Sequence, residues 1–334
     1  MRPRLNEIAE VASVSPATVS RVLNERPGVA SSTRERVLAA AERLGLRRST
    51  PTPGVVGVIT PELDNPVFSL QAHTIENRLA RLGLLPMLCV ATQQAVHEAA
   101  YLEHLLDVGV AGLVVVSGRY AEDGADLSLY DPVRRAGVPT VLVNGIDSDA
   151  MFPAVCVDER AATVMAVRHL RSLGHERIGC LPGQLRYRSS EYKAEGWGSA
   201  TDGRHGDLLV ETPFTVEGGH AGAMALLDLG ATAFTCANDL MALGVIRAVR
   251  DRGLSVPDDI SVVGYDGTPV TQFTDPALTT VRQPFEPMAA AVTELLVRDH
   301  NSAAPKIQFF APELVVRSST GACRGVTLSA VDAG

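Results

Sequence analysis

The sequence predicts a small all-α helix-turn-helix domain followed by a two-lobed α/β core with parallel, doubly wound sheets. Three short amphipathic helices fit within about the first 45 residues, which is typical of a helix-turn-helix unit. From residue 55 onward, short apolar runs alternate with helical stretches over about 230 residues, as in parallel sheets covered on both faces. A length of 334 residues with 46% hydrophobic content allows two or three domains with buried cores.

The first two helices are predicted over residues 5–12 and 16–24, with a tight two-residue turn between them. The first helix carries an apolar stripe at helical spacing, formed by Leu5, Ile8, Ala9 and Ala12. Ser15 can cap the N–H groups at the start of the second helix, and Pro16 suits its first position. The apolar face of this second helix consists of Val19, Val22 and Leu23.

The opposite face of the second helix suits a negatively charged partner, because it carries a cation and no acid before Glu25. Arg21 can reach guanine O6 and N7 as a fork, which discriminates between bases by about 1–3 kcal/mol. Thr18, Ser20 and Asn24 are better placed for phosphate contacts. The sequence therefore predicts that this helix reads DNA.

A third helix is predicted to begin near Ser32, which has capping-box spacing to Glu35, and to end at Gly45. Its buried stripe consists of Val37, Leu38, Ala41 and Leu44. The three helices together predict a DNA-reading unit. The alternative is an ordinary three-helix cap on a larger domain.

The charge distribution places any nucleic-acid contact in the N-terminal part of the chain. Residues 1–48 hold nine Arg and five Glu, a net charge of +4. The rest of the chain carries a net charge of −12, which gives −8 for the whole sequence. Attraction to phosphate is the sequence-independent part of DNA binding, so a basic head on an acidic body favours contact through the head.

Residues 46–54 are predicted to form an extended linker. Two prolines and one glycine in this stretch exclude a regular helix. Arg47 and Arg48 can contact phosphate or enter the minor groove, although two solvated arginines are the alternative.

The core is predicted from strands and helices that alternate along the chain. Predicted strands cover residues 55–59, 84–90, 112–116, 140–143, 177–181, 233–236 and 260–265. Predicted helices cover residues 67–82, 95–107, 160–173, 217–228 and 240–252. Two series of strands predict two lobes that face each other.

Ligands bind outside the carboxyl ends of parallel strands, which between two lobes form a cleft. Polar side chains follow four of the predicted strands: Ser117, Asn144, Asn238 and Asp266. Such groups suit polyhydroxylated ligands such as sugars, and aromatic faces for stacking are offered by Phe68, Phe214 and Phe285. Several of these residues also suit plain structural roles: Asn238 as a helix cap, Asp266 as a turn residue, and the phenylalanines as core packing.

The run from Val14 to Asn24 resembles the recognition-helix signature of the lactose-repressor (LacI/GalR) family of bacterial transcription regulators. The resemblance continues through residues 33–37 and over nearly the whole chain, with Ser13 at a turn where the family usually has Gly. It implies a periplasmic-binding-protein-like core whose chain crosses between lobes near residues 157, 282 and 311. In this family, the positions of Pro16 and Ala17 choose bases; here they offer only apolar contact.

The resemblance also implies a domain organisation and effector residues. Residues 1–45 form the DNA-binding domain, 46–54 the linker, 55–322 the core and 323–334 a tail. The lobes comprise about 55–157 plus 282–311, and about 158–281 plus 312–322.

Residues 237–244 and 261–266 are similar to family motifs whose Asn and Asp, here Asn238 and Asp266, hydrogen-bond the effector. Phe214 and Phe285 match aromatic residues that often line the pocket. Lys193 stands where the family commonly has an effector-binding Arg. A Lys cannot make the bidentate contact, so it predicts altered specificity, with a solvated Lys193 as the alternative.

One departure concerns the linker, which lacks the family's hinge-helix motif; this puts central kinking of the operator, and the usual coupling of effector to DNA, in doubt. The remaining resemblance implies a homodimer on pseudo-palindromic, double-stranded operator DNA, with residues 67–82 a candidate dimer face. A C-terminal tetramerising coiled coil is not expected.

Enzymes and transport proteins are the rival classes. The chain has no phosphate loop, dinucleotide-binding glycine motif or nucleophile elbow, which argues against an enzyme. No metal or cofactor is expected, because the five cysteines are scattered without ligand spacing and suit buried thiols. The absence of a signal peptide and of membrane-spanning runs predicts a cytoplasmic protein. A sugar-binding sensor with weakened or lost DNA binding remains an alternative to the ligand-responsive repressor.

Overall fold

The computed structural model describes residues 5–23, 29–44, 54–91, 95–145, 152–204, 206–297 and 307–324. The chain divides into two compact units near residues 53 and 54, a helical head and an α/β core. Three predictions lie outside the described residues: Asn24, the linker with Arg47 and Arg48, and most of the C-terminal tail.

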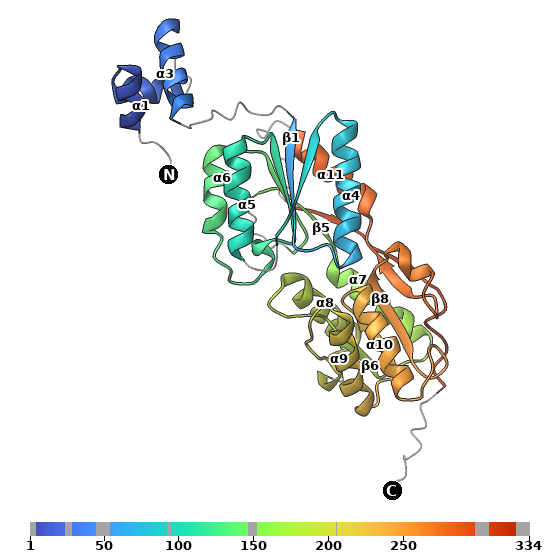
Figure 1. Cartoon of the computed structure of the whole chain (residues 1–334). Helices are drawn as coiled ribbons and strands as arrows, with labels where there is room; N and C mark the ends of the chain where they lie inside the picture. Colours follow the sequence, from blue (N-terminus) through green and yellow to red (C-terminus); the bar gives the residue numbers. More distant parts are fainter. Residues whose placement is uncertain are drawn as a thin grey trace. The chain divides into compact units, whose positions relative to one another are not determined.

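The head contains three helices, α1 (Leu5–Ala12), α2 (Pro16–Leu23) and α3 (Ser31–Arg43) (Figure 1). The α1–α2 turn places Ser13 at φ 51°, a left-handed conformation that explains why the family usually has Gly there. Ser15 Oγ accepts a hydrogen bond from Thr18 N at 3.1 Å, as expected of a helix cap.

A small apolar core joins the three helices of the head. It consists of Ile8, Ala9, Ala12, Val19, Val22, Val37, Ala40 and Ala41. The prediction for Leu5 was wrong, because its side chain is 46% exposed at the first position of α1, outside this small core. Ser32 lies inside the first turn of α3 rather than before it, since the helix begins at Ser31.

The first lobe of the core is built on a six-stranded parallel sheet in the order β10-β5-β4-β3-β1-β2. Its strands are β1 (Val55–Thr60), β2 (Leu85–Val90), β3 (Gly112–Val116), β4 (Thr140–Val143), β5 (Ala154–Val157) and β10 (Ile307–Phe310). Helices cover both faces of this sheet (Figure 1). One pair is α4 (Pro66–Arg81) with α11 (Phe285–Val297), and the other is α5 (Ala95–Val108) with α6 (Asp131–Ala136).

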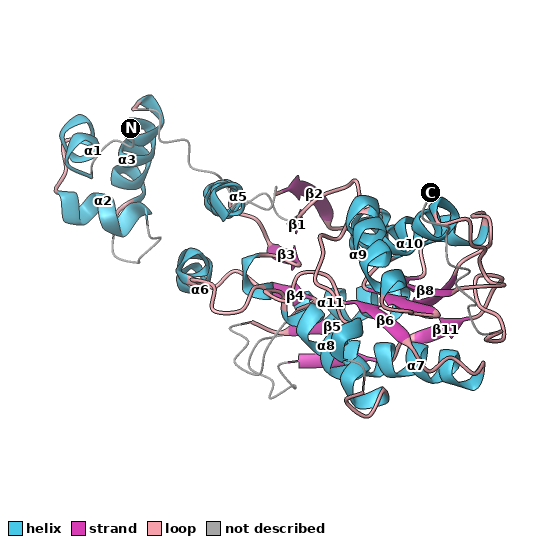
Figure 2. Ribbon diagram, turned by 90° about the horizontal axis from the view of Figure 1, so that it is seen from below, coloured by secondary structure: helices cyan, strands magenta, loops and turns pink. Residues whose placement is uncertain are grey.

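The second lobe is built on a five-stranded sheet in the order β11-β9-β8-β7-β6. Its strands are β6 (Ile178–Leu181), β7 (Ala233–Cys236), β8 (Ser261–Asp266), β9 (Thr279–Arg282) and β11 (Glu313–Val315), of which only β11 runs antiparallel to its neighbour. Paired helices cover this sheet on opposite sides (Figure 2). They are α7 (Glu159–Ser172) with α8 (Arg188–Ala200), and α9 (Val216–Asp228) with α10 (Asp239–Asp251).

The predicted fold class is confirmed, and the structure adds elements that the pattern did not name. The strands that the pattern did not name are β5, β9, β10 and β11, which are three or four residues long. The chain passes between the two sheets after β5, β9 and β10, and these strands end at residues 157, 282 and 310.

The strands of both sheets form an apolar interior. All residues of β1, β3, β4 and β5 are buried in the first sheet, and all residues of β6, β7 and β8 in the second. Cys89, Cys156, Cys180 and Cys236 belong to this buried interior and form no disulfide. Among the described residues, the helices include none that is both long and apolar enough to cross a bilayer.

Candidate effector pocket and DNA-reading helix

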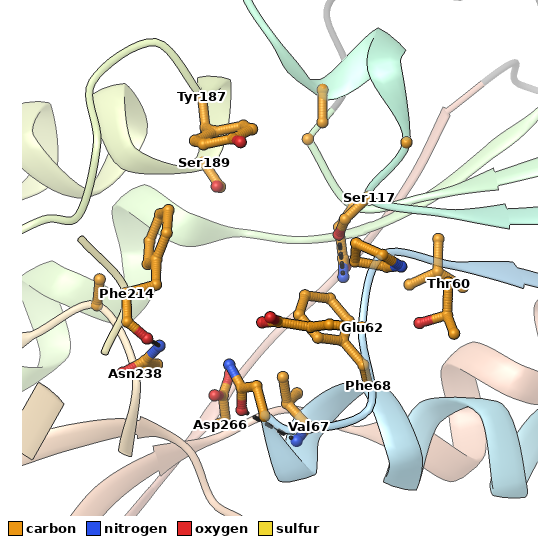
Figure 3. A pocket seen from close by; sticks show the side chains of 18 of the residues that line it. Thr60, Glu62, Val67, Phe68, Ser117, Tyr187, Ser189, Phe214, Asn238 and Asp266 are labelled. Carbon is orange, nitrogen blue, oxygen red and sulfur yellow. Dashed lines mark hydrogen bonds between the residues drawn. The ribbon is translucent and has the colours of Figure 1, made fainter. Parts of the chain in front are cut away.

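A pocket of about 1110 Å³, including the part open to solvent, lies at the carboxyl ends of strands from both sheets (Figure 3). Residues from both lobes line it, which matches the expected place for a ligand in an α/β core. Seven of the eight predicted effector residues line the pocket: Phe68, Ser117, Asn144, Lys193, Phe214, Asn238 and Asp266.

Phe285 is the predicted residue that does not line the pocket. It is the half-buried first residue of α11, and its N–H donates to the backbone oxygen of Gln283 at 3.0 Å. This turn brings Gln283, and not Phe285, to the pocket.

Three of the polar pocket residues have positive φ angles at strand ends. Ser117 has φ 46°, Asn144 has φ 68° and Asp266 has φ 109°. Residues other than glycine rarely adopt positive φ angles, and residues with such backbone strain cluster at functional sites. These backbone conformations are an observation, independent of any sequence motif, that favours the rim of the pocket as a candidate functional site.

Asn238 has two structural partners at the pocket wall. Its Oδ1 accepts a hydrogen bond from Met241 N at 2.8 Å, which caps α10, and its Nδ2 donates to Phe214 O at 3.1 Å. Asn238 therefore caps a helix, as the alternative interpretation expected, and it also lines the pocket beside Phe214 (Figure 3).

Lys193 is buried, so the alternative of a solvated side chain was wrong. Its Nζ lies 2.5 Å from Glu159 Oε2, and each of these side chains is only 8% exposed. The same Nζ lies 4.1 Å from the centroid of the Tyr265 ring. The Lys ammonium is thus held by neighbours within the protein.

A chain of side-chain amides connects the two lobes behind the pocket. Gln283 Nε2 donates to Asp266 Oδ1 at 2.8 Å, and Gln71 Nε2 donates to Gln283 Oε1 at 3.2 Å. Asn144 Nδ2 lies 3.5 Å from Gln71 Oε1. Because Asp266 accepts from Gln283, the NH₂ groups of Gln283, Gln71 and Asn144 each donate to the next member of the relay in the direction of Asp266.

Burial controls the acidity of two carboxyl groups beside this relay. It raises the pKa of Asp239 to about 6, although the hydroxyl of Thr280 and the N–H and hydroxyl of Thr268 donate to Asp239. Burial, with the nearby charge of Asp239, also raises the pKa of Asp266 well above its usual range. Each ligand hydroxyl that donates to the buried, poorly solvated carboxyl group of Asp266 contributes more binding free energy than it would at an exposed carboxyl group.

The first lobe contributes a second set of acids and aromatic rings. Glu98 Oε2 accepts from Arg119 N at 2.9 Å, and its Oε1 accepts from the Tyr130 hydroxyl; burial raises its pKa. Arg119 Nη1 lies 2.5 Å from Glu122 Oε2. A Cβ at Gly118 would lie 2.6 Å from Glu98 Oε1, so only glycine fits between these groups.

The pocket includes functional groups that sequence reasoning missed: Glu62, Glu98, Glu122, Glu159, Tyr187, Ser189 and Gln283. Tyr187 and Phe214 pack as a tilted pair with ring centroids 5.7 Å apart, while Phe68 contributes a ring from the other lobe (Figure 3). Glu62 follows the end of β1 closely in the sequence, and that position after a strand is the sequence signal that could have identified it.

In the head, α2 presents its predicted DNA-contacting side to solvent. Pro16, Ala17 and Arg21 are exposed, whereas Thr18 and Ser20 are half-buried. The Thr18 hydroxyl lies 2.8 Å from Ser15 Oγ, so part of its hydrogen-bonding capacity serves the cap. Val19 and Val22 of the same helix are fully buried, which fixes the orientation of the exposed side.

A helix-turn-helix head with an exposed cation, carried on a two-lobed core with a polar pocket, defines the class of ligand-binding transcription regulators. The lacI family of bacterial regulatory proteins matches residues 4–49, and the periplasmic binding protein-like domain matches residues 167–320. The chain belongs to the lacI family of bacterial regulatory proteins. It is a DNA-binding transcriptional regulator and not an enzyme.

Relatives match over nearly the whole chain. The HTH-type transcriptional regulator MalR of Streptomyces coelicolor is 46% identical over 97% of this chain and 98% of its own length. The lac repressor dimer bound to operator and the anti-inducer ONPF is 29% identical, with a TM-score of 0.71 over 96% of this chain and 100% of its own. The complex of the regulator CelR with cellobiose is 27% identical, with a TM-score of 0.71 over 95% and 100%.

Proposed function

We propose that this protein is a cytoplasmic, homodimeric repressor whose affinity for operator DNA is controlled by a sugar bound between the two lobes of its core. The observation that carries the proposal is the convergence of polar and aromatic side chains from both lobes on one pocket. A ligand that bridges the lobes would favour one arrangement of them, and the head units of a dimer would change their spacing.

The structures of two relatives support the two halves of this proposal. The lac repressor dimer is bound to operator DNA, and CelR is bound to cellobiose. Here Arg21 would read a base, Ser117, Asn144, Asn238 and Asp266 would hydrogen-bond the sugar hydroxyls, and the rings of Phe68 and Phe214 would pack against its apolar faces. The exposed side of α4, which includes His73, Glu76 and Asn77, is the proposed dimer face.

Thermal unfolding in the presence of ribose, glucose, cellobiose and maltose tests the ligand. A sugar at a hundred times its dissociation constant stabilises the folded protein by about 2.7 kcal/mol. We expect at least one of these sugars to raise the melting temperature of the wild type, and Asp266→Asn to lose most of that shift. If no sugar shifts the wild type, the ligand class is wrong.

Electrophoretic mobility shift with the DNA upstream of the protein's own gene tests the head. We expect Arg21→Ala to lose about 1–3 kcal/mol of binding free energy to the specific site. Arg36→Ala is the matched control, because Arg36 is an exposed arginine on α3 and its substitution removes the same charge. Equal loss in both variants would exclude base reading by Arg21. A wild type that binds sugar but no DNA would instead support the sensor with lost DNA binding.

A further inference from the structure

Among the described residues that line the pocket, two side chains are cationic, and each is paired with an acid of the same pocket. Lys193 Nζ lies 2.5 Å from Glu159 Oε2, and Arg119 Nη1 lies 2.5 Å from Glu122 Oε2. Both partners of the Lys193 pair are almost fully buried, so neither can turn out to solvent. An anionic ligand would have to displace a carboxylate that is already in contact with the cation.

Acidic groups outnumber cations in the pocket lining. The acids are Glu62, Glu98, Glu122, Glu159 and Asp266. Burial raises the pKa of Glu98 and of Asp266, yet each cation retains its own acidic partner whether or not these two carboxyl groups are ionised. The pocket therefore has no uncompensated positive side chain for a phosphate or carboxylate among its described residues.

The helix N-termini near the pocket are also occupied. Asn65 caps α4 through Val67 N, Asp158 caps α7 through Ala161 N, and Asn238 caps α10 through Met241 N. Helix α8 has no side-chain cap, but its first turn carries an acid, Glu191. Helix N-termini are common phosphate sites. Here a side-chain cap already occupies one N–H group at the start of α4, α7 and α10, and Glu191 in the first turn of α8 pairs with Arg188.

We propose that this pocket accepts an uncharged polyhydroxylated ligand and rejects phosphorylated sugars and nucleotides, with Glu159 and Glu122 as the residues that set this selectivity. The inference rests on the proposed function, because it names the class of sugar for the same pocket. Glu159 would act by neutralising Lys193, and Glu122 by neutralising Arg119. Their remaining lone pairs stay available to ligand hydroxyl groups.

Titration with inorganic phosphate, followed by calorimetry and by the ³¹P resonance, tests the selectivity without knowledge of the sugar. We expect no saturable binding to the wild type in the millimolar range. Glu159→Gln and Glu122→Gln release one cation each and should bind phosphate at least tenfold more tightly than the wild type. The same variants should gain affinity for glucose 6-phosphate relative to glucose.

Glu195→Gln is the matched control, because Glu195 lies on α8, pairs with Arg160 at the surface, and its substitution removes the same charge outside the pocket. It should not gain phosphate binding. Phosphate binding by the wild type as tight as by the variants, or folded variants without any gain, would overturn the inference. If the variants gain phosphate but no sugar binds the wild type, the anion selectivity stands and the sugar effector fails. If Glu159→Gln does not fold, Glu122→Gln alone tests the inference, because the Glu122 side chain is more exposed than that of Glu159.

Discussion

The two lobes share an architecture but present different kinds of polar residue at their strand ends. In the second lobe, Asn238 caps α10 and Asp266 accepts from Gln283. In the first lobe, Thr60 Oγ1 and Asn144 Oδ1 are buried without a hydrogen-bond partner in the described part of the chain. At the strand ends of the second lobe, Asn238 and Asp266 are thus already used by the protein, and the unmet hydrogen-bonding capacity of that wall lies in the buried Tyr265 hydroxyl. The first lobe instead keeps unmet capacity in the strand-end residues themselves.

This difference separates what each wall contributes. Changes in the second lobe remove contacts that the fold itself uses, so they should lower stability and ligand affinity together. Changes at the first-lobe strand ends remove groups that the proposed ligand would satisfy, so they should lower affinity with little effect on stability. A buried polar group without a partner is costly, and a ligand hydroxyl that satisfies it recovers that cost.

The largest effect is expected for Lys193→Met in the second lobe. The substitution leaves the Glu159 carboxylate buried without its cation, which should cost about 3–5 kcal/mol of unfolding free energy. Urea unfolding measures this cost. Glu195→Gln, which breaks an exposed pair on the same helix, should cost less than about 1 kcal/mol. A loss of similar size in both variants would show that the buried pair has no special role.

Asn238→Ala should lower stability by about 1–2 kcal/mol, because α10 loses its cap and Phe214 O loses a donor. Sugar affinity should fall in the same variant. Thr215→Ala removes the cap of α9, whose Gly218 N donates to Thr215 Oγ1, at a residue outside the pocket. That control should lose about 1 kcal/mol of stability and keep its sugar affinity. Retained affinity in Asn238→Ala would limit this residue to capping.

The amide relay is one of the contacts between the two lobes, and Gln71→Met tests whether it couples them. The variant leaves Gln283 Oε1 without its donor and should lose about 1 kcal/mol of stability. A double-mutant cycle with Gln283→Met should show a coupling of about 1 kcal/mol, because the second substitution removes the same contact. Strictly additive losses would mean that the lobes are not coupled through these side chains.

Ser117→Gly should have the smallest effect on stability. Glycine adopts the left-handed conformation at φ 46° without strain, and this gain offsets its greater backbone entropy, so unfolding free energy should stay within about 1 kcal/mol of the wild type. Sugar affinity should nevertheless fall by about 1 kcal/mol, measured by calorimetry, because a hydroxyl is lost from the first wall. A variant that loses stability but keeps affinity would reverse the comparison between the lobes.

Sequence reasoning identified the strand-end residues because parallel strands bring their carboxyl ends to one edge, so position along the chain predicts position at the cleft. The same reasoning did not find Gln71, which is 212 residues from its partner Gln283. It also left open a solvated Lys193, because the acid that holds Lys193 comes from another helix. Periodicity describes one element at a time, and such pairs exist only after elements pack.

The sequence by itself determined the head, the alternation of strands and helices, and the polar residues at strand ends, since helical spacing, capping and strand burial are local properties of the chain. Only the tertiary structure decided which charges meet, that Lys193 is held by Glu159, and that Gln283 lines the pocket while Phe285 does not. Ion pairing and burial depend on residues distant in sequence, and those distances close only when two lobes fold around three crossings of the chain.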